Sequence, residues 1–234
     1  MPTFRSGSAS ATSDTSKTAT PLFSLDAAHP LTSELGPSVA PVREAPLGAS
    51  SRLFASAVAL FAEKGFHGTS TRDICRAAGT GETAIYDHFS SKEEILFLVM
   101  QLSHEEALRR LALADAKDPD DPPARLSRLA SAFACFHAAW PIATRVANYE
   151  LAALTHEHFL HIRALREQVE GYFDRVLEDG LKHGDFLIAN KRPLLFAIIS
   201  MSIGVSRWFR HDGPLTPEEL GEQYGRFAVR MVGA

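Results

Sequence analysis

The segment from Thr69 to Glu94, TSTRDICRAAGTGETAIYDHFSSKEE, limits the possible folds of this chain more than any other. Ser70 and Asp73 have the spacing of a capping box, in which two side chains satisfy free N–H groups at the start of a helix. Gly79 can adopt the left-handed conformation that ends a helix. After a turn, a second short helix is predicted from Glu82 to Phe89. Two short helices that cross closely at a glycine-containing turn are typical of a helix-turn-helix, whose second helix enters a major groove of DNA.

A further helix is predicted before this segment. Apolar side chains recur with the helical period from Leu53 to Phe61, and Gly65 follows as a stop. Phe66 is expected to fold back onto Phe61. Residues 49–95 are therefore predicted to form a three-helix DNA-binding domain.

The rest of the chain is predicted to be helical as well. Ser91 and Glu94 have capping-box spacing and begin a long helix that runs to about Lys117, where the sequence DPDDPP follows at 118–123. No later segment alternates apolar and polar residues with a period of two, so the predicted fold class is all-α. The later helices are predicted at Ala124–Ala139, Pro141–Leu154, Glu157–His183, Arg192–Arg210 and Pro217–Val232.

Residues 1–48 are predicted to be a disordered extension. They are rich in Ser, Thr, Ala and Pro, and their prolines interrupt any long helix. Such a composition cannot bury enough apolar surface to offset the entropy of ordering the chain. Neither folding nor recognition of DNA is expected to need this segment.

Composition narrows the function. The net charge is −4, and residues 50–95 carry five Lys and Arg against six Asp and Glu. This balance argues against strong non-specific DNA binding and is compatible with specific binding by a dimer that concentrates a few cations on one face. Cys75 and Cys135 lie in apolar helical patterns and are expected to be reduced and buried.

The apolar run Leu194 to Val205 is too short to cross a bilayer, and the N-terminus has no signal-peptide pattern. A cytoplasmic protein without membrane contact is expected.

The segment IYDHFSSKEEIL resembles the signature of TetR-type transcriptional regulators, and TSTRDICRAAG resembles their first DNA-facing helix. The resemblance is dense from Ser51 to Leu98 and weaker toward the C-terminus. It implies a ligand-responsive transcriptional repressor that acts as a homodimer on a pseudo-palindromic double-stranded DNA operator. It implies no catalytic residue and no cofactor, and it assigns residues 96–234 to ligand binding and dimerisation.

A second resemblance concerns the C-terminal half. The segments NYELAALTHEHF and SRWFRHDGPLTPEELGEQYGRFAVRMVG are similar to TetR-type regulators of lipid, steroid-ring and branched-chain acid catabolism. That subgroup implies a small-molecule effector of the acyl-CoA type and a dimer formed by the last two helices. Small and apolar residues that suit such an interface are Ser200, Ile203, Gly204, Gly221, Gly225, Ala228 and Val229.

Candidate DNA contacts lie in the helix-turn-helix. Tyr86 and His88 can donate to phosphate oxygens, a role favoured over the alternative that they fill the space beside the long helix. Lys92 lies in a first helical turn, where free N–H groups also favour a phosphate. Glu82 can accept from a cytosine or remain solvated, and the family pattern differs here and at Gly81 and Asp87. The candidates together are Ser70, Thr71, Glu82, Thr83, Tyr86, Asp87, His88 and Lys92.

Candidate residues of an effector pocket lie in the C-terminal helices, where aromatic side chains are concentrated. They are Phe133, Phe136, His137, Trp140, Asn148, Tyr149 and Trp208, and the alternative for most of them is ordinary core packing. The anionic part of an acyl-CoA needs cations, for which Arg145, Arg163, Arg166 and Arg207 are available.

Three rival functions remain open. A regulator of drug efflux would have the same fold. A helical metal-dependent enzyme would use the histidines between His156 and His161, although no zinc-like partner spacing appears elsewhere, so no metal site is expected. A protein–protein adaptor without DNA binding would explain the acidic balance of the head.

Overall fold

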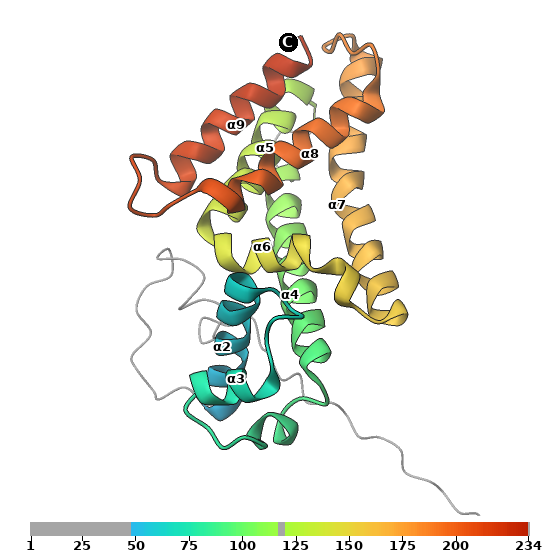
Figure 1. Cartoon of the computed structure of the whole chain (residues 1–234). Helices are drawn as coiled ribbons and strands as arrows, with labels where there is room; N and C mark the ends of the chain where they lie inside the picture. Colours follow the sequence, from blue (N-terminus) through green and yellow to red (C-terminus); the bar gives the residue numbers. More distant parts are fainter. Residues whose placement is uncertain (1–47, 117–119, 234) are drawn as a thin grey trace, which may run out of the picture.

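The computed structural model describes residues 48–116 and 120–233, and every regular element within these ranges is helical (Figure 1). The elements are α2 (Ala49–Lys64), α3 (Thr71–Ala77), the 3-10 helix η1 (Ala84–Asp87), α4 (Lys92–Asp115), α5 (Pro122–Ala139), α6 (Pro141–Tyr149), the 3-10 helix η2 (Leu151–Ala153), α7 (His156–His183), α8 (Lys191–Trp208) and α9 (Pro217–Met231). The predicted all-α fold class is confirmed. Except for Gly48, the predicted extension lies outside the described residues, as does part of the predicted break at 118–123.

α2, α3 and η1 form a small unit, called the head, at the lower end of the molecule in Figure 1. α2 ends where the sequence predicted, because Gly65 has a φ of 74° and its N–H donates to the Phe61 carbonyl. Phe66 then folds back, with its ring centroid 5.5 Å from that of Phe61. The side chain of Ile74 on α3 is fully buried and completes the core of the head.

The second short helix is shorter than predicted. The sequence indicated a helix from Glu82 to Phe89, whereas the structure has one 3-10 turn at η1. The N–H groups of Ala84, Tyr86 and His88 each donate to a carbonyl three residues back, and Thr83 provides no side-chain cap. The inward positions were predicted correctly, because Ile85 and Phe89 are both buried.

α4 runs from the head into the C-terminal bundle, as predicted for the long helix. Ser91 caps it by accepting from the Glu94 N–H at 3.0 Å. The capping box is incomplete, since the Glu94 carboxylate bonds to the N–H and hydroxyl of Ser90 instead. The apolar side of α4 includes Leu96 and Leu111, both with no exposed surface.

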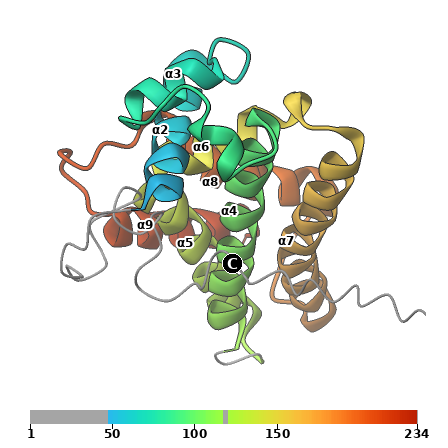
Figure 2. The same ribbon diagram turned by 90° about the horizontal axis from the view of Figure 1, so that it is seen from below.

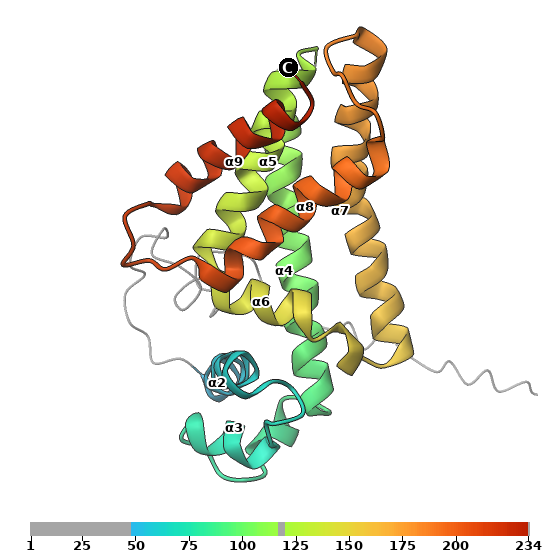
Figure 3. The ribbon, with the colours of Figure 1, turned by 45° about the horizontal axis from the view of Figure 1, so that its top comes forward.

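The bundle of α5 to α9 surrounds the upper part of α4. α9 and α7 lie on opposite sides of α4 and α5 (Figures 1 and 2), and α8 crosses between them (Figure 3). α6 ends earlier than predicted: the chain leaves the α-helix after Tyr149 and forms η2, whose N–H groups bond three residues back. Over the described ranges, no helix is long and apolar enough to cross a membrane.

The predicted role of the α9 glycines at a dimer interface is wrong. α9 packs along α5 (Figure 3). A Cβ on Gly221 would lie 2.7 Å from the Ser131 carbonyl oxygen, and one on Gly225 would lie 2.6 Å from that of Ser127. Ala228 is also fully buried. These small residues bring α9 close to α5 of the same chain, so they are not available to a partner.

Candidate nucleic-acid interface and effector cavity

The candidate DNA-contacting residues of η1 and its flanks form one exposed surface. Glu82, Thr83, Tyr86, Asp87 and His88 are all exposed, and Tyr86 has 60% of its surface accessible. The buried side chains next to them in the sequence anchor this segment to the head. The arrangement leaves a phenol, an imidazole and a threonine hydroxyl free to meet a ligand at this end of the molecule.

Ser70 caps α3 as predicted. Its hydroxyl accepts from the Asp73 N–H at 3.1 Å, and the Asp73 carboxylate accepts from the Ser70 hydroxyl at 2.6 Å and from its N–H at 3.2 Å. The hydrogen bond from the Ser70 side chain lowers the pKa of Asp73. Thr71, the first residue of α3, is half-buried. The start of α3 is therefore held mainly by bonds within the head.

Lys92 is turned toward the head. Its ammonium donates to the carbonyl oxygens of Phe66 and Thr69, both at 2.7 Å, and lies 4.0 Å from the centroid of the Phe66 ring. Burial lowers the pKa of this amine. Two of its three N–H donors are thus used within the protein, and the first turn of α4 is tied to the loop between α2 and α3.

Sequence reasoning missed Arg72. Its Nε lies 3.4 Å from a carboxylate oxygen of Glu82, and both side chains are more than 70% exposed. This ion pair places a cation beside the acidic residue of the turn. The spacing of ten residues between them gives no helical signal, so only the folded turn brings them together.

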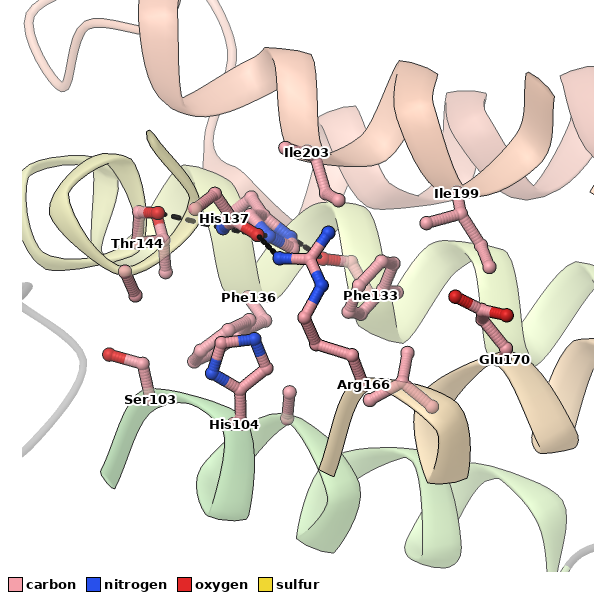
Figure 4. Close-up of a pocket in the computed structure, with 14 residues that line it drawn as sticks. Ser103, His104, Phe133, Phe136, His137, Thr144, Arg166, Glu170, Ile199 and Ile203 are labelled. Atoms are coloured by element: carbon pink, nitrogen blue, oxygen red, sulfur yellow. Dashed lines mark hydrogen bonds between the residues drawn. The ribbon is translucent and has the colours of Figure 1, made fainter. Parts of the chain in front are cut away.

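A cavity of about 30 Å³ lies inside the bundle, between α4, α5, α6, α7 and α8 (Figure 4). Its apolar lining is Ala107, Phe133, Phe136, Ala147, Val169, Ile199 and Ile203. Its polar lining is Ser103, His104, His137, Thr144, Asn148, Arg166 and Glu170. The volume is enough for about two water molecules, since each needs about 10–15 Å³.

Of the candidate pocket residues, Phe133, Phe136, His137 and Asn148 line this cavity, and the others do not. Trp140 is buried elsewhere, with the Arg110 guanidinium 4.2 Å from its ring centroid. Tyr149 is half exposed and lies beneath the Arg207 guanidinium, at 5.3 Å. Trp208 is 52% exposed at the end of α8.

Asn148 organises the polar side of the cavity. Its amide nitrogen donates to the Thr144 carbonyl at 2.7 Å and lies 3.4 Å from Nε2 of His137. Its amide oxygen accepts from Arg166 Nη1 at 3.3 Å. In Figure 4 the Arg166 guanidinium extends toward His137, while the Glu170 carboxylate lies nearer to Ile199. The cavity therefore contains a partly buried cation that has no carboxylate directly on it among the residues described.

Burial keeps the two cavity histidines neutral. It lowers the pKa of His104 and of His137 from the ordinary 6.5 to about 4. Their Nδ1 atoms lie 2.7 Å from the Met100 carbonyl and 2.8 Å from the Phe133 carbonyl, respectively. Burial also lowers the pKa of Arg166, and the charge of Glu170 opposes that effect.

Sequence reasoning did not name five of the polar cavity residues as pocket candidates, although it named Arg166 among the available cations. Ser103, His104, Thr144, Arg166 and Glu170 are polar side chains outside the aromatic cluster from which the candidates were predicted. A usable signal existed for His104. It continues the helical spacing of the buried side of α4, where a polar residue is unusual.

The histidines near the start of α7 are engaged with α4. His158 Nδ1 lies 2.9 Å from both carboxylate oxygens of Glu93, and its ring stacks on Phe97 at 3.9 Å. The His161 ring meets the same Phe97 edge-on at 5.4 Å. Throughout 48–116 and 120–233, no group of three or more His, Cys, Asp or Glu side chains is arranged to hold a metal ion.

A helix-turn-helix head joined by one long helix to a bundle with an internal cavity defines a class of ligand-responsive DNA-binding regulators. Residues 53–99 match the family described as bacterial regulatory proteins of the tetR family, and residues 119–232 match the tetracyclin repressor-like C-terminal domain. The HTH-type transcriptional repressor KstR2 of Mycobacterium tuberculosis is 33% identical over 177 residues, which are 72% of this chain and 84% of that protein. The chain belongs to the TetR family, and it is a DNA-binding transcriptional repressor, not an enzyme.

Solved structures agree with this fold. A tetR-family protein from Rhodococcus RHA1 superposes with a TM-score of 0.73 at 33% identity, covering 80% of this chain and 97% of that one. The fold is also that of AibR in complex with isovaleryl coenzyme A and operator DNA, with a TM-score of 0.68 at 21% identity, covering 79% of this chain and 98% of that one.

Proposed function

We propose that this repressor acts as a homodimer on a pseudo-palindromic operator and is released by an acyl-CoA thioester. The observation that carries the proposal is the cavity with Arg166 in its wall, next to the helix that leads to the head. The relatives named KstR2 support a repressor, and the solved complex of AibR with isovaleryl coenzyme A and operator DNA supports a CoA thioester as the effector. The head and first turn of α4, residues 49–95, would bind DNA, and residues 96–234 would bind the effector and the partner.

Release requires a change in how the head is held. The cavity is walled by α4, which begins at the head, and by α6. Arg145 on α6 donates to the Ala62 carbonyl of α2 at 3.3 Å, so α6 touches the head directly. An effector that separates the cavity walls would displace both helices. The effector shifts the equilibrium toward the displaced form only to the extent that it binds this form more tightly than the DNA-binding form.

The effector must open the cavity to enter. A volume of about 30 Å³ is far below the roughly 300–1,000 Å³ of most small-molecule sites. Of the four arginines considered as partners for the effector, only Arg166 lines the cavity. Arg163 is exposed and pairs with Glu167 at 3.1 Å. Arg145, on α6, bonds to the head, and Arg207, on α8, lies over the ring of Tyr149 on α6. Arg166 is therefore the cation that we assign to oxygen atoms of the acyl-CoA.

The dimer is proposed to form through the outer faces of α8 and α9. Phe196 and Trp208 on α8 are exposed apolar side chains, as are Phe227 and Met231, which lie four residues apart on one face of α9. Gly204, also on α8, has no atom within 4 Å of the position of its Cβ, so a partner helix can approach there. Two such faces together would bury the apolar side chains that one copy leaves in water.

The test is a titration of the repressor–operator complex. The operator is first obtained by sequencing DNA fragments retained by the purified protein. Saturated acyl-CoAs of increasing length and the matching free acids are then added, and fluorescence anisotropy of labelled operator is measured. Release by the thioesters and not by the acids supports the proposal. Release only by the acids, or only by hydrophobic drugs, contradicts the acyl-CoA assignment and leaves the repressor assignment intact.

A further inference from the structure

His104 on α4 presents an acceptor to the cavity that nothing in the described protein satisfies. Its Nδ1 lies 2.7 Å from the Met100 carbonyl, and a carbonyl only accepts, so the proton must be on Nδ1. The ring is neutral because burial lowers its pKa to about 4. Nε2 therefore carries a lone pair, and no donor from the described residues bonds to it. The residue is only 7% exposed.

His137, the second imidazole of the cavity, is a useful comparison. It has the same Nδ1 bond to a carbonyl four residues back, at 2.8 Å. Its Nε2, however, has the amide nitrogen of Asn148 at 3.4 Å. The chain thus supplies a partner for one of two equivalent acceptors and leaves the other facing the space between Phe136 and Arg166 (Figure 4).

Arg166 supplies the complementary group. Its guanidinium has five N–H donors, and the described residues use one of them, in the bond to Asn148 at 3.3 Å. Arg166 and His104 line the same cavity, from α7 and α4 respectively (Figure 4). The cavity therefore combines an acceptor that needs a proton with a donor that needs an oxygen. A hydroxyl group can satisfy both, whereas an alkyl chain satisfies neither and a ketone satisfies only the arginine.

We propose that the acyl part of the effector carries a hydroxyl group, which donates to Nε2 of His104 and accepts from Arg166. The inference rests on the proposed function of this cavity as an acyl-CoA site, and it specifies a hydroxyacyl rather than a saturated acyl thioester. His104 is the residue that discriminates, because a saturated chain leaves its buried lone pair unsatisfied. A site built to bond a hydroxyl discriminates strongly against the analogue that lacks it.

The test compares matched pairs of ligands on the full-length protein. Saturated and 3-hydroxy acyl-CoAs of four and of eight carbons are titrated by calorimetry against the wild type, His104→Phe and Thr144→Val. The wild type should bind the hydroxy member of a pair at least about tenfold more tightly, because its hydroxyl makes two buried hydrogen bonds that the saturated chain lacks. His104→Phe keeps the ring shape and should lose most of this preference, because only the bond from Arg166 is left to the hydroxyl. Thr144→Val should keep the preference, because the Thr144 hydroxyl already donates to the Trp140 carbonyl at 2.7 Å.

A second measurement does not depend on affinity. The nitrogen-15 resonance of His104 Nε2 should move when the hydroxyacyl-CoA binds and stay in place with the saturated one. Equal binding of both members by the wild type, or a preference in His104→Phe as large as in the wild type, overturns the hydroxyl assignment alone. If no thioester of either kind binds, the acyl-CoA proposal fails and this inference fails with it.

Discussion

At the scale of single residues, the position of Lys92 gives a prediction that separates two roles. The sequence suggested a phosphate contact, whereas the ammonium lies on the Phe66 and Thr69 carbonyls. Lys92→Met should therefore lower the thermal stability of the head and weaken operator binding. The dependence of log K on log salt should keep its slope, because no phosphate contact is lost. Thermal melts and anisotropy at several salt concentrations measure both quantities.

The opposite result would support the assignment of Lys92 to a phosphate. If the melting curve of Lys92→Met is unchanged and the salt slope falls by about 0.9, one phosphate contact has been removed. Arg109→Met is the control for loss of a cation, since Arg109 lies on the same helix away from the head and pairs with Glu106 at 2.6 Å. It should alter neither the slope nor the affinity.

The buried histidines predict how stability depends on pH. The pKa of His137 is about 4 in the folded chain and about 6.5 in the unfolded one. Between pH 6.5 and pH 4 the imidazole is protonated in the unfolded chain and neutral in the folded one. The free energy of unfolding therefore falls as the pH is lowered from 6.5 toward 4. His104 acts in the same direction. Each histidine changes the free energy of unfolding by up to about 1.4 kcal/mol per pH unit in this range.

Urea denaturation between pH 7 and pH 5 measures this slope while most carboxylates remain ionised. His137→Phe should reduce the loss of free energy of unfolding across this range. His211→Gln is the control, because that ring is exposed in the folded chain and in the unfolded chain alike. A wild-type protein with constant stability from pH 7 to pH 5 would show that neither ring is neutral by burial.

At the scale of elements, the first turn of α4 joins three parts of the molecule. Lys92 holds the loop between α2 and α3. Glu93 accepts from the Thr155 N–H at 2.8 Å and from His158, both at the start of α7. Arg166 in the cavity wall lies on the same α7. A shift of α7 caused by a ligand at Arg166 therefore reaches the turn that carries the head.

Glu93→Ala removes the link between α4 and α7. We expect operator affinity without effector to change little and the effector-dependent loss of affinity to shrink several-fold, because the coupling free energy is typically about 1–3 kcal/mol. The Thr155 amide should exchange its hydrogen faster. Glu105→Ala is the matched control on α4, since Glu105 accepts only from Gln101 on the same helix. Unaltered coupling in Glu93→Ala would mean that the signal travels by another route, such as α6.

At the scale of the whole molecule, the exposed apolar face of α8 and α9 predicts the oligomeric state. Phe227→Arg places a charge at this face, on a side chain that is 43% exposed in one copy. The variant should be monomeric in sedimentation velocity at concentrations where the wild type is dimeric, and it should lose operator affinity. Leu113→Arg, on an exposed side chain of α4, should remain a dimer. A dimeric Phe227→Arg protein would place the interface elsewhere.

The helices and the family were readable from the sequence because their signals are local. The capping box of Ser70 and Asp73, the stop at Gly65 and the cap at Ser91 each involve atoms within four residues. Such contacts form in any fold that keeps the helix. The helical period identified Ile85 and Phe89 as buried for the same reason, although it overestimated the length of η1.

Only the tertiary structure decided which face of each helix meets which neighbour. Gly225 suited a dimer interface in the sequence, yet it is the point where α9 touches α5. Lys92 suited a phosphate, yet its ammonium donates hydrogen bonds to two carbonyls in a preceding loop. Trp208 suited a pocket, whereas the cavity is formed around Arg166 and His104. The period of a helix determines that a residue is on one side of it, but long-range packing determines what lies on that side.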